Sequence, residues 1–579
     1  MTTHKLWYMC KYSPVEFLAG FGADTARLEA ELDTFDTADA LGHPNICGYG
    51  KALLETCANT EVREVLLVNC CDVARRIYDI LKRQGNLDFL WILDLPHTRS
   101  RAAGWMFERD LTRFLEAYES YSGIPFDYMR AWNRMKEQAQ EEDHRAETGA
   151  YISLQGAHGG PKMVQMLESH FSVPVRDDTC SGNRSLYQIE MPRDRAEFIH
   201  LYAGSLLQQT PCMRMRDVSD RNVLGKGASG IVYHTMKFCD YYGFEYAEKK
   251  NANIPLLKIE TDAGSQSRGQ LATRLDAFAE QLRLAWKGGR KAARGMRLST
   301  DSIYKKNHAE QETDAEKDRR MVRKYVAGID SGSTSTDVVI MNRDREIVSW
   351  SIQRTGAGAA SGAERALAKA IENAGCSPDD IDMVITTGYG RTAIGLGDDD
   401  VTEITCHAKG AHYLNPDTRT IIDIGGQDSK VIRIDAEGNV TNFIMNDKCA
   451  AGTGRFLEMM ARTLEISMEE MERLGSTWKQ DITISNMCTV FAESEVVSLI
   501  AMNTPAPDII HGLNKAVAKK TAALAARMGG GDVYMMTGGV AKNAALVAEL
   551  EKTMGVRIAV SEHAQLCGAI GAALIALEG

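Results

Sequence analysis

The stretch YVAGIDSGSTSTDVVIMNRDREIVSWSIQRTG (325–356) decides the fold of the C-terminal half. Its apolar and polar residues alternate with the period of two typical of half-buried strands, and a turn rich in Gly, Ser and Thr follows Asp330. A related pattern occurs at DIGGQD (423–428), whose turn precedes the strand VIRI. Two hairpins of this kind indicate an internal duplication, in which two similar α/β lobes surround a cleft.

Both turns have the composition of a phosphate-binding site, because Gly, Ser and Thr present N–H groups and hydroxyls without steric obstruction. We expect Asp330 and Asp423 to face one another and hold Mg²⁺, and Gln427 to orient the water that attacks the γ-phosphate of ATP. Alternatively, Gln427 is an ordinary polar turn residue. The segment MMTGGVAKNAAL (535–546) adds glycines that let the backbone approach a nucleoside. The predicted nucleotide-binding residues are Ser331, Gly332, Ser333, Thr334, Thr336, Gly425, Gly426, Gly538, Gly539 and Asn543.

Residues 325–578 resemble the ATPase activators of 2-hydroxyacyl-CoA dehydratases and the ATPase subunits of benzoyl-CoA reductase. This resemblance implies a duplicated fold of the actin and sugar-kinase type, and ATP hydrolysis. One position departs from the pattern, because Asp337 stands where Lys is common, which puts a phosphate-proximal Lys there in doubt. The motifs that carry the resemblance are GIDSGSTSTD (328–337), TTGYGR (386–391), EITCHAKGA (403–411), IIDIGGQDSK (421–430), NDKCAAGTGRFLE (446–458), MCTVFAESEVVSL (487–499) and TGGVAKN (537–543).

Two cysteines of this half precede predicted helices. Cys449 lies in DKCAAGTGRF and Cys488 in SNMCTVFAESEV, so the positive end of each helix dipole favours a thiolate and an anionic cluster. Two ligands cannot complete a 4Fe-4S cube, which takes four, whereas a two-fold homodimer supplies the other two. The resemblance implies the same arrangement, one 4Fe-4S cluster between two subunits. The thiols assigned to packing or loops are Cys376, Cys406 and Cys567.

The N-terminal half alternates strand-like apolar runs, such as VREVLLVNCCD (62–72), with amphipathic stretches, which indicates parallel α/β units. A stretch rich in Lys and Arg and poor in large apolar residues (287–324) separates it from the C-terminal half. The predicted fold class is therefore α/β throughout. We expect two α/β lobes at 1–145 and 146–290, a charged linker at 291–323 and the ATPase domain at 324–579.

Several cysteines before the linker occur in turn-like segments rich in Gly, Pro, Asn and Asp, where backbone N–H groups can hydrogen-bond ligand sulfurs. Cys57 lies in the helical stretch KALLETCANT and is expected to pack in the core. Cys70 and Cys71 are adjacent on a predicted strand, so we expect their side chains to point in opposite directions, with only one of them facing a cluster. His97 and His158 lie near these turns and are either proton shuttles or structural residues.

The N-terminal half resembles the cluster-bearing subunits of 2-hydroxyacyl-CoA dehydratases and their double-cubane-cluster relatives. The motifs concerned include HPNICGYGK, VNCCDVARRIYD, DDTCSGNR, TPCMRM and HTMKFCD. In the dehydratase type, three cysteines hold one 4Fe-4S cube, and by motif these are Cys47, Cys71 and Cys239. Adding Cys10, Cys180 and Cys212 raises the count to six, which suits a double-cubane 8Fe-9S cluster; burial of Cys10 or Cys212 as packing residues stays open.

Composition limits the classes of function. The 579 residues are 44% hydrophobic and 25% charged, which is typical of globular domains, and a net charge of −11 argues against nucleic-acid or anionic-membrane binding. The 13 cysteines include no C-x-x-C motif, which disfavours zinc ribbons and thioredoxin-type sites. No apolar run reaches the roughly 18 residues of a membrane span, and we expect a cytoplasmic protein.

These features, with the resemblances, predict an ATP-hydrolysing iron–sulfur reductase. Its ATPase dimer would take electrons from reduced ferredoxin or flavodoxin and pass them from its 4Fe-4S cluster to the N-terminal cluster, which reduces a small molecule. One alternative is a 2-hydroxyacyl-CoA dehydratase with a built-in activator, acting on an acyl-CoA substrate. Another is a nucleotide-gated assembly or sensor without turnover.

Overall fold

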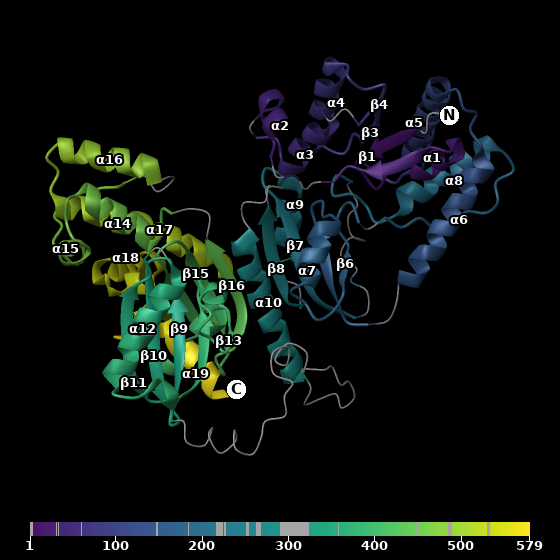
Figure 1. Ribbon diagram of the computed structural model, residues 1–579. Coiled ribbons are helices and arrows are strands. Elements are labelled where there is room, and N and C mark those ends of the chain that lie inside the picture. Colours follow the sequence, from purple (N-terminus) through teal and green to yellow (C-terminus); the bar gives the residue numbers. More distant parts are fainter. Residues whose placement is uncertain are drawn as a thin grey trace, which may run out of the picture. The chain divides into compact units, whose positions relative to one another are not determined.

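The protein divides into two compact units, Met1–Leu282 and Arg283–Gly579, each treated by itself below (Figure 1). Among the described residues no helix is long and apolar enough to cross a membrane. The predicted linker, 291–323, lies outside the described residues. The computed structural model describes residues 4–29, 32, 34–43, 45–58, 61–145, 149–182, 184–215, 224, 227–249, 254–261, 268–289, 324–356, 358–446, 450–484, 489–529 and 533–578.

The N-terminal unit contains two four-stranded sheets, and every paired strand in them runs parallel. Their orders are β2-β1-β3-β4 and β6-β5-β7-β8. Parallel strands place their carboxyl ends at one edge of a sheet, where ligands of α/β proteins collect. The strands are β1 (Lys5–Tyr8), β2 (Asp24–Arg27), β3 (Glu64–Val68), β4 (Phe89–Leu93), β5 (Tyr151–Gly156), β6 (Val175–Asp177), β7 (Ala228–Met236) and β8 (Leu256–Thr261).

Helices connect these strands, as the alternating pattern predicts. The core of the unit is rich in aromatic residues, and the fully buried rings of Phe17 and Tyr202 stack with centroids 4.7 Å apart. The helices are α1 (Val15–Phe21), α2 (Asp36–Leu41), α3 (Gly48–Cys57), α4 (Asp72–Gln84), α5 (Arg101–Ser122), α6 (Tyr128–Arg145), α7 (Pro161–Glu168), α8 (Arg195–Gln208), α9 (Asp240–Lys249) and α10 (Arg268–Gly289).

The C-terminal unit is an internal duplication, as the two hairpins predict. Its two five-stranded sheets have orders β11-β10-β9-β12-β13 and β16-β15-β14-β17-β18. In each, three antiparallel strands are followed by two parallel ones, so the topologies are identical and correspond to the actin and sugar-kinase type. The strands are β9 (Tyr325–Ser331), β10 (Ser335–Asn342), β11 (Ile347–Arg354), β12 (Ile381–Thr387), β13 (Asp399–Asp400), β14 (Thr420–Ile424), β15 (Ser429–Ile434), β16 (Val440–Asn446), β17 (Tyr534–Thr537) and β18 (Ile558–Val560).

Helices α13 and α19 cross at very close range in this unit. A Cβ on Gly571 would lie 1.8 Å from the carbonyl oxygen of Cys406, and one on Gly410 would lie 2.0 Å from that of Cys567. Only glycine allows this approach. The helices of the unit are α12 (Ala359–Ala374), α13 (Glu403–Leu414), α14 (Gly454–Thr463), α15 (Met468–Leu474), α16 (Thr489–Ala501), α17 (Ala506–Met528), α18 (Ala544–Met554) and α19 (Cys567–Glu578).

Candidate functional site

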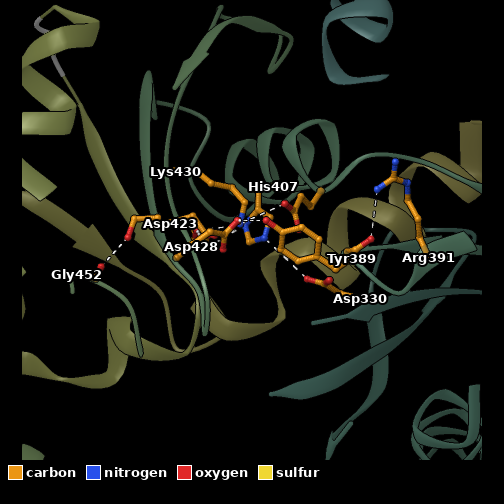
Figure 2. Close-up of polar contacts among 12 residues, drawn as sticks. Asp330, Tyr389, Arg391, His407, Asp423, Asp428, Lys430 and Gly452 are labelled. Carbon is orange, nitrogen blue, oxygen red and sulfur yellow. Dashed lines mark hydrogen bonds and ion pairs between the residues drawn. The ribbon is translucent and has the colours of Figure 1, made fainter. Parts of the chain in front are cut away.

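The two predicted catalytic carboxylates lie on either side of one imidazole ring. Asp330 is near the end of β9 and Asp423 is in β14, the equivalent strand of the second sheet. His407, from α13, places Nε2 3.9 Å from Asp330 Oδ2 and Nδ1 3.6 Å from Asp423 Oδ1 (Figure 2). The structure therefore brings both aspartates to one site, with the His407 ring as their common neighbour.

Lys430 balances the charge of this site. Its ammonium group lies 2.9 Å from Asp428, 3.1 Å from Asp423 and 3.4 Å from Glu403, and all four side chains are almost completely buried (Figure 2). Burial raises the pKa of Glu403 to about 8, although Lys430 opposes the shift. The pKa of Asp423 is about 2, because His407 and Lys430 together outweigh the opposing effect of burial. Asp423 is thus ionised at neutral pH and suited to a cation.

The two predicted phosphate-binding turns approach each other. A Cβ on Gly426 would lie 2.5 Å from Thr334 Oγ1 and 2.9 Å from Ser333 Oγ, so glycine is needed where the turns meet. Gln427 follows directly and is exposed. Backbone N–H of Gly332 donates to Ser335 and closes the first turn at 2.9 Å. The structure therefore places residues from both hairpins together, with exposed hydroxyls on the first turn.

The third glycine segment reaches the same carboxylates. Gly538 has φ +86°, and a Cβ there would lie 2.9 Å from Asp423 Oδ1. Gly425 is next to the second turn, and a Cβ on it would lie 2.8 Å from Asp428 Oδ1. In the described part of the chain, leaving out its sequence neighbours, the nearest atom to the corresponding point on Gly539 lies 4.0 Å away, so this side of the backbone is open.

Of three other predicted nucleotide residues, Asn543 and Thr336 form hydrogen bonds within the protein, whereas Ser331 is buried without a side-chain partner among the described residues. Asn543 is buried and caps α18, where its side chain accepts from the N–H of Leu546. The Thr336 hydroxyl lies 3.0 Å from that of Thr355, on the face of β10 opposite to that of Asp337. Ser331 is buried, and its hydroxyl has no hydrogen-bond partner among the described residues. The structure does not bring the Asn543 and Thr336 side chains to the carboxylates.

Asp337, the position that departs from the resemblance, is paired with Asp330 in the β9–β10 ladder. Directly paired residues share one face of a sheet, so Asp337 lies on the same face as Asp330. Its side chain is 5% exposed, and one carboxylate oxygen has no hydrogen-bond partner among the described residues. Burial, assisted by the charge of Asp330, raises the pKa of Asp337 to about 8.

Sequence reasoning missed Lys430, His407, Glu403 and Asp428, although all lie in motifs quoted for the resemblance. A usable signal existed for Lys430, because a lysine within the buried strand SKVIRI needs a carboxylate partner. Glu403 and His407 offer a similar signal, since they lie one turn apart on α13 in an apolar setting. The predicted cluster ligands Cys449 and Cys488 lie outside the described residues.

A second site lies in the N-terminal unit, around a cavity of about 60 Å³. Its walls include six cysteines, and a seventh, Cys10, contacts the Cys70 thiol. Most of them follow the carboxyl ends of parallel strands, the edge where α/β folds bind ligands. Cys10 follows β1, Cys70 and Cys71 follow β3, Cys180 follows β6 and Cys239 follows β7, whereas Cys47 starts α3 and Cys212 follows α8.

Helix starts surround this cavity. Cys47 and Cys71 are the N-cap residues of α3 and α4, and Cys239 immediately precedes α9. Backbone N–H groups at such positions donate to sulfur and favour negative charge there. Burial nevertheless raises the pKa of Cys47 to about 11 and that of Cys239 to about 12. Neutral thiols are therefore costly to ionise in this cavity unless a cation or metal compensates the charge.

The thiols are mutual neighbours. The neighbouring thiols Cys10 and Cys71 raise the pKa of Cys70, and Cys212 raises that of Cys180. The neighbouring Cys70 thiol lowers the pKa of Cys71 to about 7, although burial acts in the opposite direction. Among the described residues no three His, Cys, Asp or Glu side chains converge on one point as a single metal ion requires.

The positions of Cys57 and Cys70 can be compared with the sequence-based expectations. Cys57 is fully buried in α3, which confirms the expectation that it packs in the core, and burial raises its pKa to about 12. The expectation that only one of Cys70 and Cys71 faces the site is wrong for this cavity, because both of them line it. The physical reason is that β3 ends at Val68, so both cysteines lie in a bend and do not alternate as strand residues.

Comparison with known proteins identifies relatives of both halves. Residues 327–576 match the BadF/BadG/BcrA/BcrD ATPase family, and residues 10–156 and 152–282 match the D-component of 2-hydroxyglutaryl-CoA dehydratase. The activator of lactoyl-CoA dehydratase from Anaerotignum propionicum is 46% identical over 254 residues, which are 44% of this chain and 98% of the relative.

Two further comparisons involve Acidaminococcus fermentans. Its (R)-2-hydroxyglutaryl-CoA dehydratase activating ATPase is 45% identical over 255 residues, 44% of this chain and 97% of the relative. The crystal structure of component A of that dehydratase is 44% identical and covers 44% of this chain and 98% of its own, with a TM-score of 0.43.

Proposed function

Because the chain belongs to the BadF/BadG/BcrA/BcrD ATPase family, we propose that it is an ATP-driven iron–sulfur reductase with activator and electron acceptor in one polypeptide. The observation that carries the proposal is the group of seven neighbouring thiols in a chain that also belongs to an ATPase family. The ATPase unit would hydrolyse ATP to drive electrons to the N-terminal unit, which reduces a small molecule. Reduced ferredoxin or flavodoxin would be the donor.

The residues of the cavity fit an iron–sulfur group. Thiolates are the ligands of such groups, and the helix starts at Cys47, Cys71 and Cys239 supply N–H donors for ligand sulfurs. The lack of a single convergent point is compatible with this fit, since the ligands of a cluster bind different irons. A bound cluster would supply a one-electron carrier. We propose the six ligands Cys10, Cys47, Cys71, Cys180, Cys212 and Cys239, which suit an 8Fe-9S double cubane.

A single 4Fe-4S cluster held by Cys47, Cys71 and Cys239 is the narrower version of this proposal. The charges of Cys47 and Cys71 both act on Cys239, so these three thiols are near one another. The number of contacting thiols favours the larger group, because three ligands would leave four further sulfurs of the same neighbourhood without a role.

Hydrolysis would take place at the cleft of the C-terminal unit. Asp330 and Asp423 would hold Mg²⁺ through water, and the exposed Gln427 would orient the attacking water. The open backbone at Gly539 and the joined turns would receive the nucleotide and its phosphates. Catalysis of this kind depends on positioning and charge stabilisation, and the closely balanced charges around Lys430 provide a preorganised setting.

A homodimer would complete the ATPase half. Cys449 and Cys488 of each subunit would together give the four thiolates of one shared 4Fe-4S cluster. The helix after Cys488 supports this arrangement, because α16 carries the exposed apolar side chains Phe491, Val497 and Ile500, and Met502 follows it. Exposed apolar faces of this kind are typical of interfaces.

A second candidate is a 2-hydroxyacyl-CoA dehydratase with a built-in activator. It is favoured by the match of the N-terminal unit to a dehydratase component. An acyl-CoA substrate would then bind at the cysteine cavity and lose water. A sensor without turnover would instead leave these cysteines free of iron.

The test is anaerobic iron and sulfide analysis with EPR spectroscopy of the full chain, in the presence and absence of ATP. We expect about ten iron atoms per chain for a double cubane with half of a shared cube, and about six for a single N-terminal cube. Reduction of the N-terminal cluster should require ATP and should fail in Asp423→Asn. Iron-free cysteines, or reduction that proceeds equally without ATP, would refute the proposal. Consumption of a 2-hydroxyacyl-CoA would favour the second candidate.

A further inference from the structure

Two residues in the wall of the cysteine cavity carry a buried nitrogen that lacks a hydrogen-bond partner. Arg214 and His158 both line the cavity, and neither Arg214 Nη1 nor His158 Nδ1 has a partner among the described residues. A buried polar group without a partner is costly, particularly when it is charged. The unpaired guanidinium arm therefore indicates an acceptor that the described part of the protein does not supply.

The guanidinium of Arg214 is held in place by His97. Arg214 Nη2 and His97 Nε2 are 2.8 Å apart, and His97 Nδ1 lies 3.4 Å from the carbonyl oxygen of Arg214. With Nη2 donating to Nε2, the neutral ring carries its proton on Nδ1 and donates weakly to that carbonyl. This pair of contacts fixes the side chain, so Nη1 is left as the buried arm that needs an acceptor.

Positive charge is distributed over both groups of contacting thiols. Arg214 acts on Cys71, in the group that also contains Cys10 and Cys70. Lys11 acts on Cys180 and Cys212, the second group. The Lys11 ammonium already donates to the Thr210 carbonyl at 2.5 Å, whereas Arg214 Nη1 has no such acceptor. Arg214 Nη1 is thus a buried cationic donor without an acceptor among the described residues, and it is available to a bound group.

We infer that Arg214 is the hydrogen-bond donor and counter-charge of the anionic iron–sulfur group in the cysteine cavity, and that it sets the reduction potential of that group. The inference rests on the proposed function. A positive charge next to a redox group favours the reduced state, which carries one more electron. Hydrogen bonds to cluster sulfurs act in the same direction. Removal of the guanidinium therefore makes the potential more negative.

The test is an EPR-monitored redox titration of the reconstituted full chain, with iron content measured in every variant. We expect Arg214→Gln to retain its iron and to lower the equilibrium constant for reduction of the N-terminal cluster about tenfold, a shift of about 59 mV. Arg214→Lys, which keeps the charge but loses the planar fork, should shift the potential less. The matched control is Arg76→Gln, an exposed arginine on α4 that pairs with Asp79 outside the cavity.

A second comparison separates charge from hydrogen bonding. Burial lowers the pKa of His158 to about 3, so its ring is neutral at physiological pH, and His158→Phe should change the potential less than Arg214→Gln. An unchanged potential in an iron-loaded Arg214→Gln protein would overturn the inference and leave the proposed function intact. If Arg214→Gln loses iron, His97→Ala is the alternative test, because it removes the contact that holds the Arg214 guanidinium. An unchanged reduction potential in His97→Ala would then overturn the inference. Wild-type protein without N-terminal iron would instead refute the proposed function and, with it, this inference.

Discussion

Lys430 and Asp423 lie opposite each other on neighbouring strands of the second sheet, with Lys430 Nζ 3.1 Å from Asp423 Oδ2 and both side chains almost completely buried. Two more carboxylates, Asp428 and Glu403, contact the same ammonium group. One buried lysine therefore contacts three acidic side chains, and the stability of this cluster depends on its charge.

Lys430→Met should lower the free energy of unfolding of the C-terminal unit by about 3–5 kcal/mol, because it leaves buried carboxylates without a counter-charge. Chemical denaturation of the full chain, followed by a probe in the C-terminal unit, measures the loss. The matched control is Lys369→Met, because Lys369 is half-exposed and pairs only with Glu372 at 2.9 Å. Equal stability of the two variants would show that the network around Lys430 is not stabilising.

Asp423→Asn should reduce kcat for ATP hydrolysis at least about 100-fold, because the variant loses the ionised carboxylate proposed to hold Mg²⁺. Nucleotide binding should change less, and the pair of measurements separates catalysis from affinity. Asp417→Asn, at an exposed position after α13, serves as the control. Full ATPase activity of Asp423→Asn would show that Asp423 is not required for catalysis.

The pH dependence of stability should change when Asp337 is replaced. With its pKa at about 8 in the folded chain and near 4 in the unfolded chain, Asp337 binds a proton in the folded state that the unfolded state has lost. Its stabilising contribution is complete below about pH 4 and is lost as the pH rises through 8. In urea titrations between pH 5 and 7, the free energy of unfolding should fall by about 1.4 kcal/mol per pH unit more for wild type than for Asp337→Asn. Parallel slopes would contradict the burial of a protonated Asp337.

Much of the fold and part of the site could be predicted from the sequence. The hairpin at Asp330 and its counterpart at Asp423 are local patterns of strand period and turn composition, so the duplication is visible without coordinates. The association of Lys430 with Glu403 is different, because it joins residues of β15 and α13 that only the packed fold brings together. Local pattern also failed at Cys70, since the strand ends two residues before it and the alternation rule no longer applies.

The crossing of α13 and α19 should not tolerate a side chain at Gly571. A Cβ there would lie 1.8 Å from the Cys406 carbonyl oxygen, and a backbone atom cannot move aside as a flexible side chain can. Gly571→Ala should therefore destabilise the C-terminal unit by about 3 kcal/mol or more. The control is Gly539→Ala, where the nearest neighbour would lie 4.0 Å away. Comparable stability of both variants in denaturant titrations would contradict the close helix contact.

Two buried cysteines of the N-terminal unit, Cys180 and Cys57, differ in their position relative to the cysteine cavity. Cys180 contacts Cys212 in the cavity, whereas Cys57 is equally buried but has no thiol neighbour acting on it. If the cavity holds an iron–sulfur group, Cys180→Ala should lose most of the N-terminal iron and sulfide, and Cys57→Ala should keep it. Both changes remove one buried sulfur, so any general effect of a lost core atom appears equally in both variants. Iron analysis under anaerobic conditions decides between them, and equal iron in the two proteins would exclude Cys180 as a ligand.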